Sequence, residues 1–179
     1  MGRTAVGKTS RIRWFRWLLV FAWMGLIFYF SSQTYQQQNL QPELREWIPA
    51  HFVQEHFSDV RFTYAGKEIS VRSLGVYAFV EFFIRKGAHF GIYLMFALLL
   101  SWALTPLVRS RLAALLIPVM LGLAYAATDE VHQWFTGDRT PLVQDVLLDG
   151  TGALCGVLVY ALFSGIFGLA AKRRSSATR

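Results

Sequence analysis

Long apolar runs alternate with shorter polar segments along the chain. Four such runs cover residues 14–31, 87–105, 112–128 and 147–171. A bilayer core about 30 Å thick is crossed by roughly 20 largely apolar residues in an α-helix. The pattern therefore predicts an all-α membrane protein, built as a four-helix transmembrane bundle.

The segment between the first and second runs has a different pattern. Residues 42–57 place apolar side chains among charged ones, which is typical of a helix lying at the membrane interface, and Pro49 should interrupt this helix. Residues 60–71 alternate apolar and polar positions about a turn at Ala65 and Gly66, which predicts a β-hairpin. We therefore expect a small helix-plus-hairpin insert over about residues 34–77. A single long helix should follow it, from about residue 74 to the end of the second run.

The composition agrees with this picture. Of the 179 residues, 54% are hydrophobic and 16% are charged, and the mean hydropathy is +0.36, values that indicate a membrane protein and not a soluble domain. The single cysteine, Cys155, excludes a disulfide within the chain. It lies between Gly152 and Gly156, a G-x-x-x-G spacing that predicts close packing against another helix. No A-x-A-like cleavage site follows the first run, so we interpret this run as a retained helix.

The basic residues predict the orientation. They gather before the first run, between the second and third runs, and after the last run, and the positive-inside rule places such segments in the cytoplasm. We therefore expect a multi-pass protein of the cell membrane with both termini cytoplasmic. Basic tails over residues 1–13 and 172–179 would flank a transmembrane domain over 14–171, whose insert would be extracellular. The net charge of +7 then needs no nucleic acid to explain it, and the expected partner is the lipid bilayer.

The remaining polar residues gather where the helices would reach the outer surface. Glu81, Arg85, His89 and Tyr93 are spaced four apart, so they should share one face of the second membrane helix. Ionisable groups at or inside a membrane are costly, so they are usually paired, hydrated or functional. We predict an outer-surface ligand-binding site built from Ser31, Ser32, Arg85, Lys86, His89, Tyr93, Asp129, Glu130, His132, Gln133, Arg139, Asp145 and Asp149.

The third and fourth membrane helices contribute several of these positions. Asp129 and His132 are three apart and can face the same neighbour. Asp145 falls in an early turn of the last helix, where the helix dipole favours an anion by about 0.3–1 kcal/mol. Asp149 lies one turn deeper, and repulsion from Asp145 requires a nearby cation, for which we pair it with Arg85.

Four motifs, in order along the chain, resemble those of the VanZ family. They are FSSQ at residues 30–33, RKGAHFGIY at 85–93, TDEVHQWFTGDR at 128–139 and QDVLLDGTGALCG at 144–156. The resemblance covers most of the chain between residues 30 and 156. It implies a bacterial membrane protein associated with low-level resistance to glycopeptide antibiotics, chiefly teicoplanin. It implies no particular biochemical activity, because the family has no settled one.

The first functional hypothesis is binding. In it, the site binds an anionic lipid headgroup or a lipid-linked cell-wall precursor at the outer leaflet, and so modulates the cell envelope. Arg85, Lys86 and Arg139 would contact phosphate groups. The neighbouring carboxylates would orient these cations and accept hydrogen bonds from sugar hydroxyls.

The second hypothesis is an enzyme that acts on a lipid-linked envelope substrate. His89 or His132 would be the general base, oriented by Asp129 or Asp149. In a related version, a divalent metal lies among Asp129, His132, Asp145 and Asp149, although the sequence contains no compact signature such as H-E-x-x-H. No other cofactor is expected.

The third hypothesis is structural, namely that these charges only brace the bundle. Four carboxylates face three cations within the predicted site, so the set is nearly balanced without a ligand. Packing and one or two polar pairs are, however, enough to hold a small bundle together.

Overall fold

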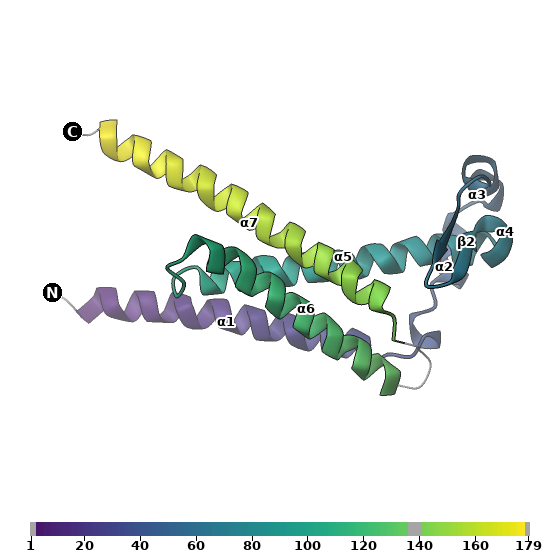
Figure 1. Ribbon diagram of the computed structural model, residues 1–179, viewed down its shortest axis with the longest axis horizontal. Helices are drawn as coiled ribbons and strands as arrows, with labels where there is room; N and C mark the ends of the chain where they lie inside the picture. Colours follow the sequence, from purple (N-terminus) through teal and green to yellow (C-terminus); the bar gives the residue numbers. More distant parts are fainter. Residues whose placement is uncertain (1–2, 136–140, 178–179) are drawn as a thin grey trace.

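Four long helices form a bundle, and an insert of short helices and a hairpin caps one end of it (Figure 1). The structure, a computed structural model, describes residues 3–135 and 141–177. The long helices are α1 (Arg3–Ser31), α5 (Val76–Leu104), α6 (Arg111–Phe135) and α7 (Val143–Ala177). The insert contains η1 (Gln36–Gln38), α2 (Gln41–Trp47), α3 (Ala50–Phe57), β1 (Arg61–Tyr64), β2 (Lys67–Ser70) and α4 (Val71–Leu74).

Each long helix is long and apolar enough to cross a membrane. The qualifying segments are Ile12–Ser31, Val76–Leu104, Arg111–Phe135 and Val143–Gly165. This confirms the predicted fold class, a four-helix transmembrane bundle with a helix-plus-hairpin insert. Helices α1 and α7 extend beyond the apolar runs, to Arg3 and Ala177, so both basic segments continue these helices as far as the structure describes them.

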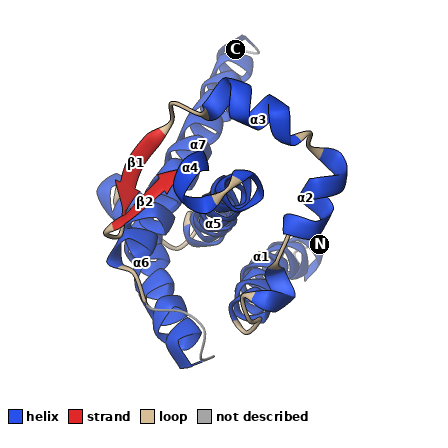
Figure 2. Ribbon diagram, turned by 90° about the vertical axis from the view of Figure 1, so that its right-hand side faces the viewer, coloured by secondary structure: helices blue, strands red, loops and turns tan. Residues whose placement is uncertain are grey.

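Helix α5 is the centre of the bundle. A view along the bundle shows α1, α6 and α7 around α5, with the elements of the insert arranged about its first turns (Figure 2). Both termini and the connection between α5 and α6 lie at one end of the long axis, and the insert lies at the other, which we call the insert end (Figure 1). The ends of α1 and α6 and the starts of α5 and α7 meet at the insert end, which is why the charged residues of the predicted site lie near this end.

Helices α5 and α7 pack through backbone at two glycines. A Cβ atom on Gly152 would overlap the carbonyl oxygen of Phe90, and one on Gly156 would overlap that of Leu94. Small residues permit this close approach of helix backbones in membranes. The predicted G-x-x-x-G edge is therefore confirmed, and it holds the first turns of α7 against α5.

Helix α1 contacts α5 and α6 through aromatic side chains that donate to backbone oxygens. The indole Nε1 of Trp23 donates to the carbonyl oxygen of Ile92 at 3.0 Å, and the Tyr125 hydroxyl donates to that of Met24 at 2.9 Å. Buried Ile27 packs in the same cluster. These contacts fix α1 beside α5. At the insert end the two helices are far enough apart to leave a cavity between them.

The insert has a small apolar core of its own. Val53 of α3 and Ile69 of β2 pack on Phe79 of α5. Strands β1 and β2 pair antiparallel across a two-residue turn at Ala65 and Gly66, both of which have positive φ, as tight hairpin turns require. The predicted hairpin, and the predicted helix interrupted at Pro49, are both confirmed.

Candidate functional site

Glu81 anchors the start of the insert to α5. Its side chain is 1% exposed, and its carboxylate accepts hydrogen bonds from the Leu40 backbone N–H at 3.1 Å and from Gln41 Nε2 at 3.0 Å. The Tyr35 hydroxyl and Arg85 Nε each donate to it at 3.2 Å. A buried carboxylate is tolerated when it is hydrogen-bonded in this way. Burial and the charge of Glu81 raise the pKa of the Tyr35 hydroxyl above its ordinary value.

Arg85 extends the same anchor. Besides Glu81, its guanidinium donates to the carbonyl oxygens of Gln38 at 2.8 Å and Tyr35 at 3.3 Å, and it lies 4.3 Å from the centre of the Tyr35 ring. Our pairing of Arg85 with Asp149 was wrong, because Glu81 lies one turn before Arg85 on the same helix and meets it first. Arg85 therefore holds η1 over the end of α5.

Lys86 connects α5 to α7 and the hairpin. Its Nζ lies 2.5 Å from Asp145 Oδ1 and 4.8 Å from the centre of the Tyr64 ring. The Tyr64 hydroxyl also donates to Asp145. Burial and this hydrogen bond to a carboxylate raise the pKa of Tyr64. The charge in the first turn of α7 is thus compensated by a cation and a phenol from two different elements.

His89 is the side chain that pairs with Asp149. Its Nδ1 lies 3.4 Å from Asp149 Oδ2, and the carboxylate is 1% exposed. The other oxygen, Asp149 Oδ1, is buried and has no hydrogen-bond partner among the described residues. Asp149 therefore depends on His89, one helix turn below the pair formed by Lys86 and Asp145.

Helix α6 contributes two further contacts at the insert end. His132 Nδ1 lies 3.1 Å from the Ser31 hydroxyl, and its ring stacks on Phe28 with centres 4.5 Å apart. Glu130 Oε2 accepts from the Leu142 backbone N–H at 2.9 Å. His132 therefore faces α1, whereas Glu130 points toward the start of α7.

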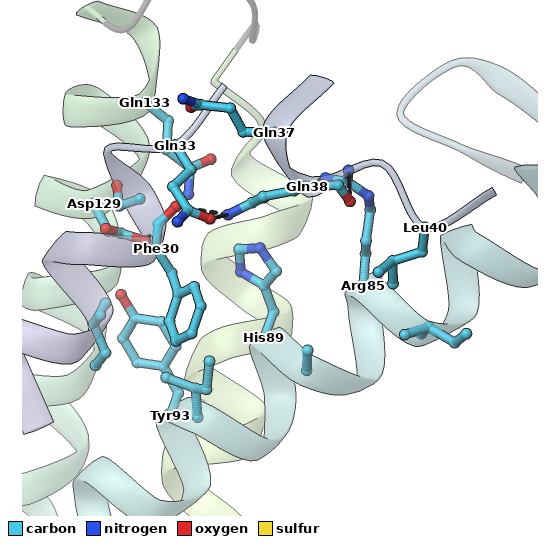
Figure 3. Close-up of a pocket in the computed structure, with 15 residues that line it drawn as sticks. Phe30, Gln33, Gln37, Gln38, Leu40, Arg85, His89, Tyr93, Asp129 and Gln133 are labelled. Atoms are coloured by element: carbon cyan, nitrogen blue, oxygen red, sulfur yellow. Dashed lines mark hydrogen bonds between the residues drawn. The ribbon is translucent and has the colours of Figure 1, made fainter. Parts of the chain in front are cut away.

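A cavity of about 370 Å³ lies between α1, α5, α6 and η1 (Figure 3). Its polar lining lies mostly toward the insert, whereas Ile27 and Ile92 lie deeper along α1 and α5. The residues that line it are Ile27, Phe30, Ser31, Gln33, Gln37, Gln38, Leu40, Ile84, Arg85, Ala88, His89, Ile92, Tyr93, Asp129 and Gln133. The arrangement offers hydrogen-bonding groups above and an apolar surface below.

Tyr93 lies at the base of this cavity. Its side chain is 1% exposed, and its hydroxyl has no hydrogen-bond partner among the described residues. Figure 3 shows this hydroxyl turned toward Asp129. A buried hydroxyl without a partner is uncommon, and a water or a bound ligand often accounts for it.

The structure brings about half of the predicted site residues to the cavity. Those that line it are Ser31, Arg85, His89, Tyr93, Asp129 and Gln133. Those placed outside its lining are Ser32, Lys86, Glu130, His132, Asp145 and Asp149. Arg139 lies outside the described residues.

Sequence reasoning missed the glutamines that roof the cavity. Gln33, Gln37 and Gln38 line it, and Gln38 Nε2 donates to the Phe30 carbonyl oxygen at 2.7 Å. The signal was a cluster of glutamines directly after the first membrane helix, which we assigned to the FSSQ motif and to the beginning of the insert.

The described residues offer no support for a metal centre. No group of three or more His, Cys, Asp or Glu side chains within residues 3–135 and 141–177 is placed to hold a metal ion. Asp145 instead binds Lys86, and His132 contacts Ser31. The version of the enzyme hypothesis that placed a metal among Asp129, His132, Asp145 and Asp149 therefore lacks a geometric basis.

Comparison with known proteins gives one result. No curated protein and no solved structure matches the chain. A family model described as VanZ/LLP1 matches residues 15–164. This range includes most or all of each of the four membrane segments, the insert and every residue that lines the cavity. The chain therefore belongs to the VanZ/LLP1 family of membrane proteins.

Proposed function

We propose that this protein binds an envelope lipid or a lipid-linked cell-wall precursor in the cavity at the insert end, and that this end faces the outer leaflet. Through this binding it would modulate sensitivity to glycopeptides such as teicoplanin. The observation that carries the proposal is the two-part lining of the cavity. Amide and imidazole groups lie toward the insert, whereas Ile27 and Ile92 lie deeper along α1 and α5, with the Tyr93 hydroxyl at the base.

This lining matches a molecule with a polar head and an apolar chain. Ligand sites are typically concave and mostly apolar, with a few polar groups that fix orientation. The cavity lies at a helix end and is bordered by exposed Phe30 and Ile84. Lipid in the surrounding bilayer could therefore contact the same apolar surface that continues into the cavity.

A steric variant tests this proposal. Ala88 lines the cavity and is exposed within it, so Ala88→Phe should occupy the space of the ligand. We expect wild-type protein purified in lauryldimethylamine oxide to carry a distinct lipid, detected by mass spectrometry, and Ala88→Phe to lose it. Cells that express Ala88→Phe should also lose any teicoplanin tolerance that the wild type confers.

The matched control is Ala127→Phe, the same substitution at an exposed position of α6 outside the cavity lining. It should retain the lipid and the tolerance. If folded wild type and Ala88→Phe carried the same lipids in the same amounts, the cavity would not be the binding site.

A second candidate is an enzyme, and one observation favours it. Asp149 accepts from His89 Nδ1, which leaves Nε2 of a neutral His89 as a base on a residue that lines the cavity. In this case the bound lipid should change in mass on incubation with wild-type protein, whereas His89→Gln should bind it unchanged. An unaltered lipid with wild-type protein would leave binding as the function.

A further inference from the structure

We infer that the cavity selects lipids with an uncharged saccharide or polyol head and disfavours a phosphate within its polar part. This inference rests on the proposed function, because it names the chemical class of the ligand of the same site. Within the proposed function it favours an envelope lipid over a precursor joined to its chain through phosphate, and it departs from the phosphate-contacting role that the sequence suggested for Arg85 and Lys86.

The cations near the cavity are already engaged. All three guanidinium nitrogens of Arg85 donate hydrogen bonds, to Glu81, Gln38 and the Tyr35 carbonyl oxygen. Lys86 is bound to Asp145 and does not line the cavity. Four of the five N–H groups of Arg85 are used in this way, so a phosphate bound by two of its nitrogens would have to break the contacts that hold the insert to α5, and one bound by Lys86 would have to break the contact between α5 and α7.

The carboxylates near the cavity add to this discrimination. Among the described lining residues Arg85 and Asp129 carry formal charges of opposite sign, and a proton on His89 would be compensated by Asp149 behind it, so the lining has no uncompensated positive charge. Glu81 and Asp149 lie directly behind Arg85 and His89. An anionic group brought into this environment meets like charges, and such juxtaposition is a common means of rejecting a ligand.

Amides and hydroxyls supply the polar surface instead. Gln33 in the loop after α1, Gln37 and Gln38 of η1 and Gln133 of α6 surround the upper part of the cavity (Figure 3). Gln38 and Gln133 are hydrogen-bonded within the protein, whereas the side chains of Gln33 and Gln37 use only their Oε1 atoms in hydrogen bonds among the described residues, so their amide N–H groups can donate to sugar hydroxyls. The Tyr93 hydroxyl, which has no partner among the described residues, adds a donor at the base.

The apolar part of the lining requires that the head carry a chain. Ile27, Phe30, Ile84 and Ile92 line the cavity, and their burial by an acyl or prenyl chain would favour binding. A free sugar has no hydrocarbon chain and therefore gains no free energy from burying these apolar side chains. The ligand is therefore an uncharged polar head on a hydrocarbon chain.

The test is a competition in phosphatidylcholine nanodiscs that contain full-length protein. Each disc receives glucosyl diacylglycerol and phosphatidylglycerol together, with identical acyl chains, at equal mole fractions. After transfer to lauryldimethylamine oxide, retained lipid is measured by native mass spectrometry. We expect glucosyl diacylglycerol to be retained severalfold more than phosphatidylglycerol, and added free glucose not to displace it.

Asp129→Asn tests the origin of the selectivity. It removes one carboxylate from the lining while keeping the shape of the side chain, so phosphatidylglycerol retention should rise severalfold. Asp59→Asn is the matched control, since Asp59 is exposed in the insert and does not line the cavity. It should retain both lipids as the wild type does.

Three results would overturn the inference. Equal retention of the two lipids, or preferential retention of phosphatidylglycerol, would leave the proposed function standing but refute the selectivity. Displacement of the glycolipid by free glucose would refute the need for a chain. Retention of neither lipid, with Ala88→Phe identical to wild type in the earlier experiment, would instead refute the proposed function itself. The wild-type competition decides the matter even if Asp129→Asn fails to fold.

Discussion

Arg85 and Lys86 are adjacent in the chain, yet they bind different parts of the molecule. Arg85 binds Glu81 and the backbone of η1, whereas Lys86 binds Asp145 at the start of α7. Successive positions on a helix point about 100° apart, so two neighbouring cations can serve two interfaces. One cation fixes the roof of the cavity, and the other fixes the helix behind it.

The pair formed by Lys86 and Asp145 should brace the fold without taking part in ligand binding. Removing one partner leaves a half-buried charge, with side chains 21% and 13% exposed, so Lys86→Met should lower the free energy of unfolding by about 1–3 kcal/mol. Adding Asp145→Leu should restore most of it, because both charges are then absent. Thermal unfolding in detergent, followed by circular dichroism, measures both effects. A double variant no more stable than Lys86→Met, or one that loses its lipid, would contradict this role.

Sequence spacing predicted the polar stripe on α5 but not the partners of its members. Glu81, Arg85, His89 and Tyr93 share a face because positions four apart do so in any helix. Which carboxylate on another helix meets which cation depends on the distance and rotation between helices. In this protein the packing of Gly152 and Gly156 against the α5 backbone sets the distance and rotation between α5 and α7. The sequence around these glycines does not reveal which residues of α5 they contact.

At the scale of elements, the close packing of α5 and α7 determines which groups face the cavity. Gly156 has no room for a Cβ beside the Leu94 carbonyl oxygen. Gly156→Ala should therefore push α7 away from α5 and destabilise the bundle by about 1–3 kcal/mol. Because His89 and Asp149 lie across this interface, the same substitution should weaken lipid retention.

Gly91→Ala is the matched control for this prediction. A Cβ at Gly91, also on α5, meets nothing within 4 Å, and alanine favours helix by up to about 1 kcal/mol over glycine. The variant should be as stable as the wild type or more stable in the same unfolding measurement. Equal stability of Gly156→Ala and wild type would show that the two helices do not depend on this contact.

The elements of the insert were predictable, but their placement was not. Alternation of apolar residues gave the hairpin, and Pro49 marked the break between α2 and α3. The contact of Tyr64 with Asp145 joins residues 81 positions apart, and the bonds from Glu81 to Leu40 and Gln41 close the base of the insert. Tertiary hydrogen bonds of this kind leave no periodic signal, which is why the roof of glutamines was missed.

For the whole molecule, the charge pattern predicts that the insert end faces outward. In a Cys155→Ala background, Thr63→Cys in the hairpin and Ser110→Cys between α5 and α6 place one thiol at each end of the bundle. An impermeant maleimide applied to intact cells should label Thr63→Cys and spare Ser110→Cys until the cells are lysed. The opposite result would place the cavity on the cytoplasmic side and remove the outer leaflet from the proposed function.

The fold as a whole was easier to predict than the site. The length of an apolar run and the positive charge beside it can be read from one segment, without knowing which helices pack against that segment. Four spans, one insert and termini at the same end all agree with the structure. The cavity was not predictable, because it arises where α1, α5, α6 and η1 fail to fill the space between them. The cavity depends on how these four elements pack together, and this packing is seen only in the three-dimensional structure.

The contacts of α7 also determine the order in which the protein can mature during synthesis. Lys86, His89 and Tyr64 are translated well before Asp145 and Asp149, which lie in the first turns of the last helix. A nascent chain that ends before Val143 therefore holds a lysine and a histidine within its membrane segments and leaves the hairpin without its docking point. Such groups are costly in a bilayer without partners. Insertion of the last helix therefore supplies the carboxylates that pair with both side chains and dock the hairpin.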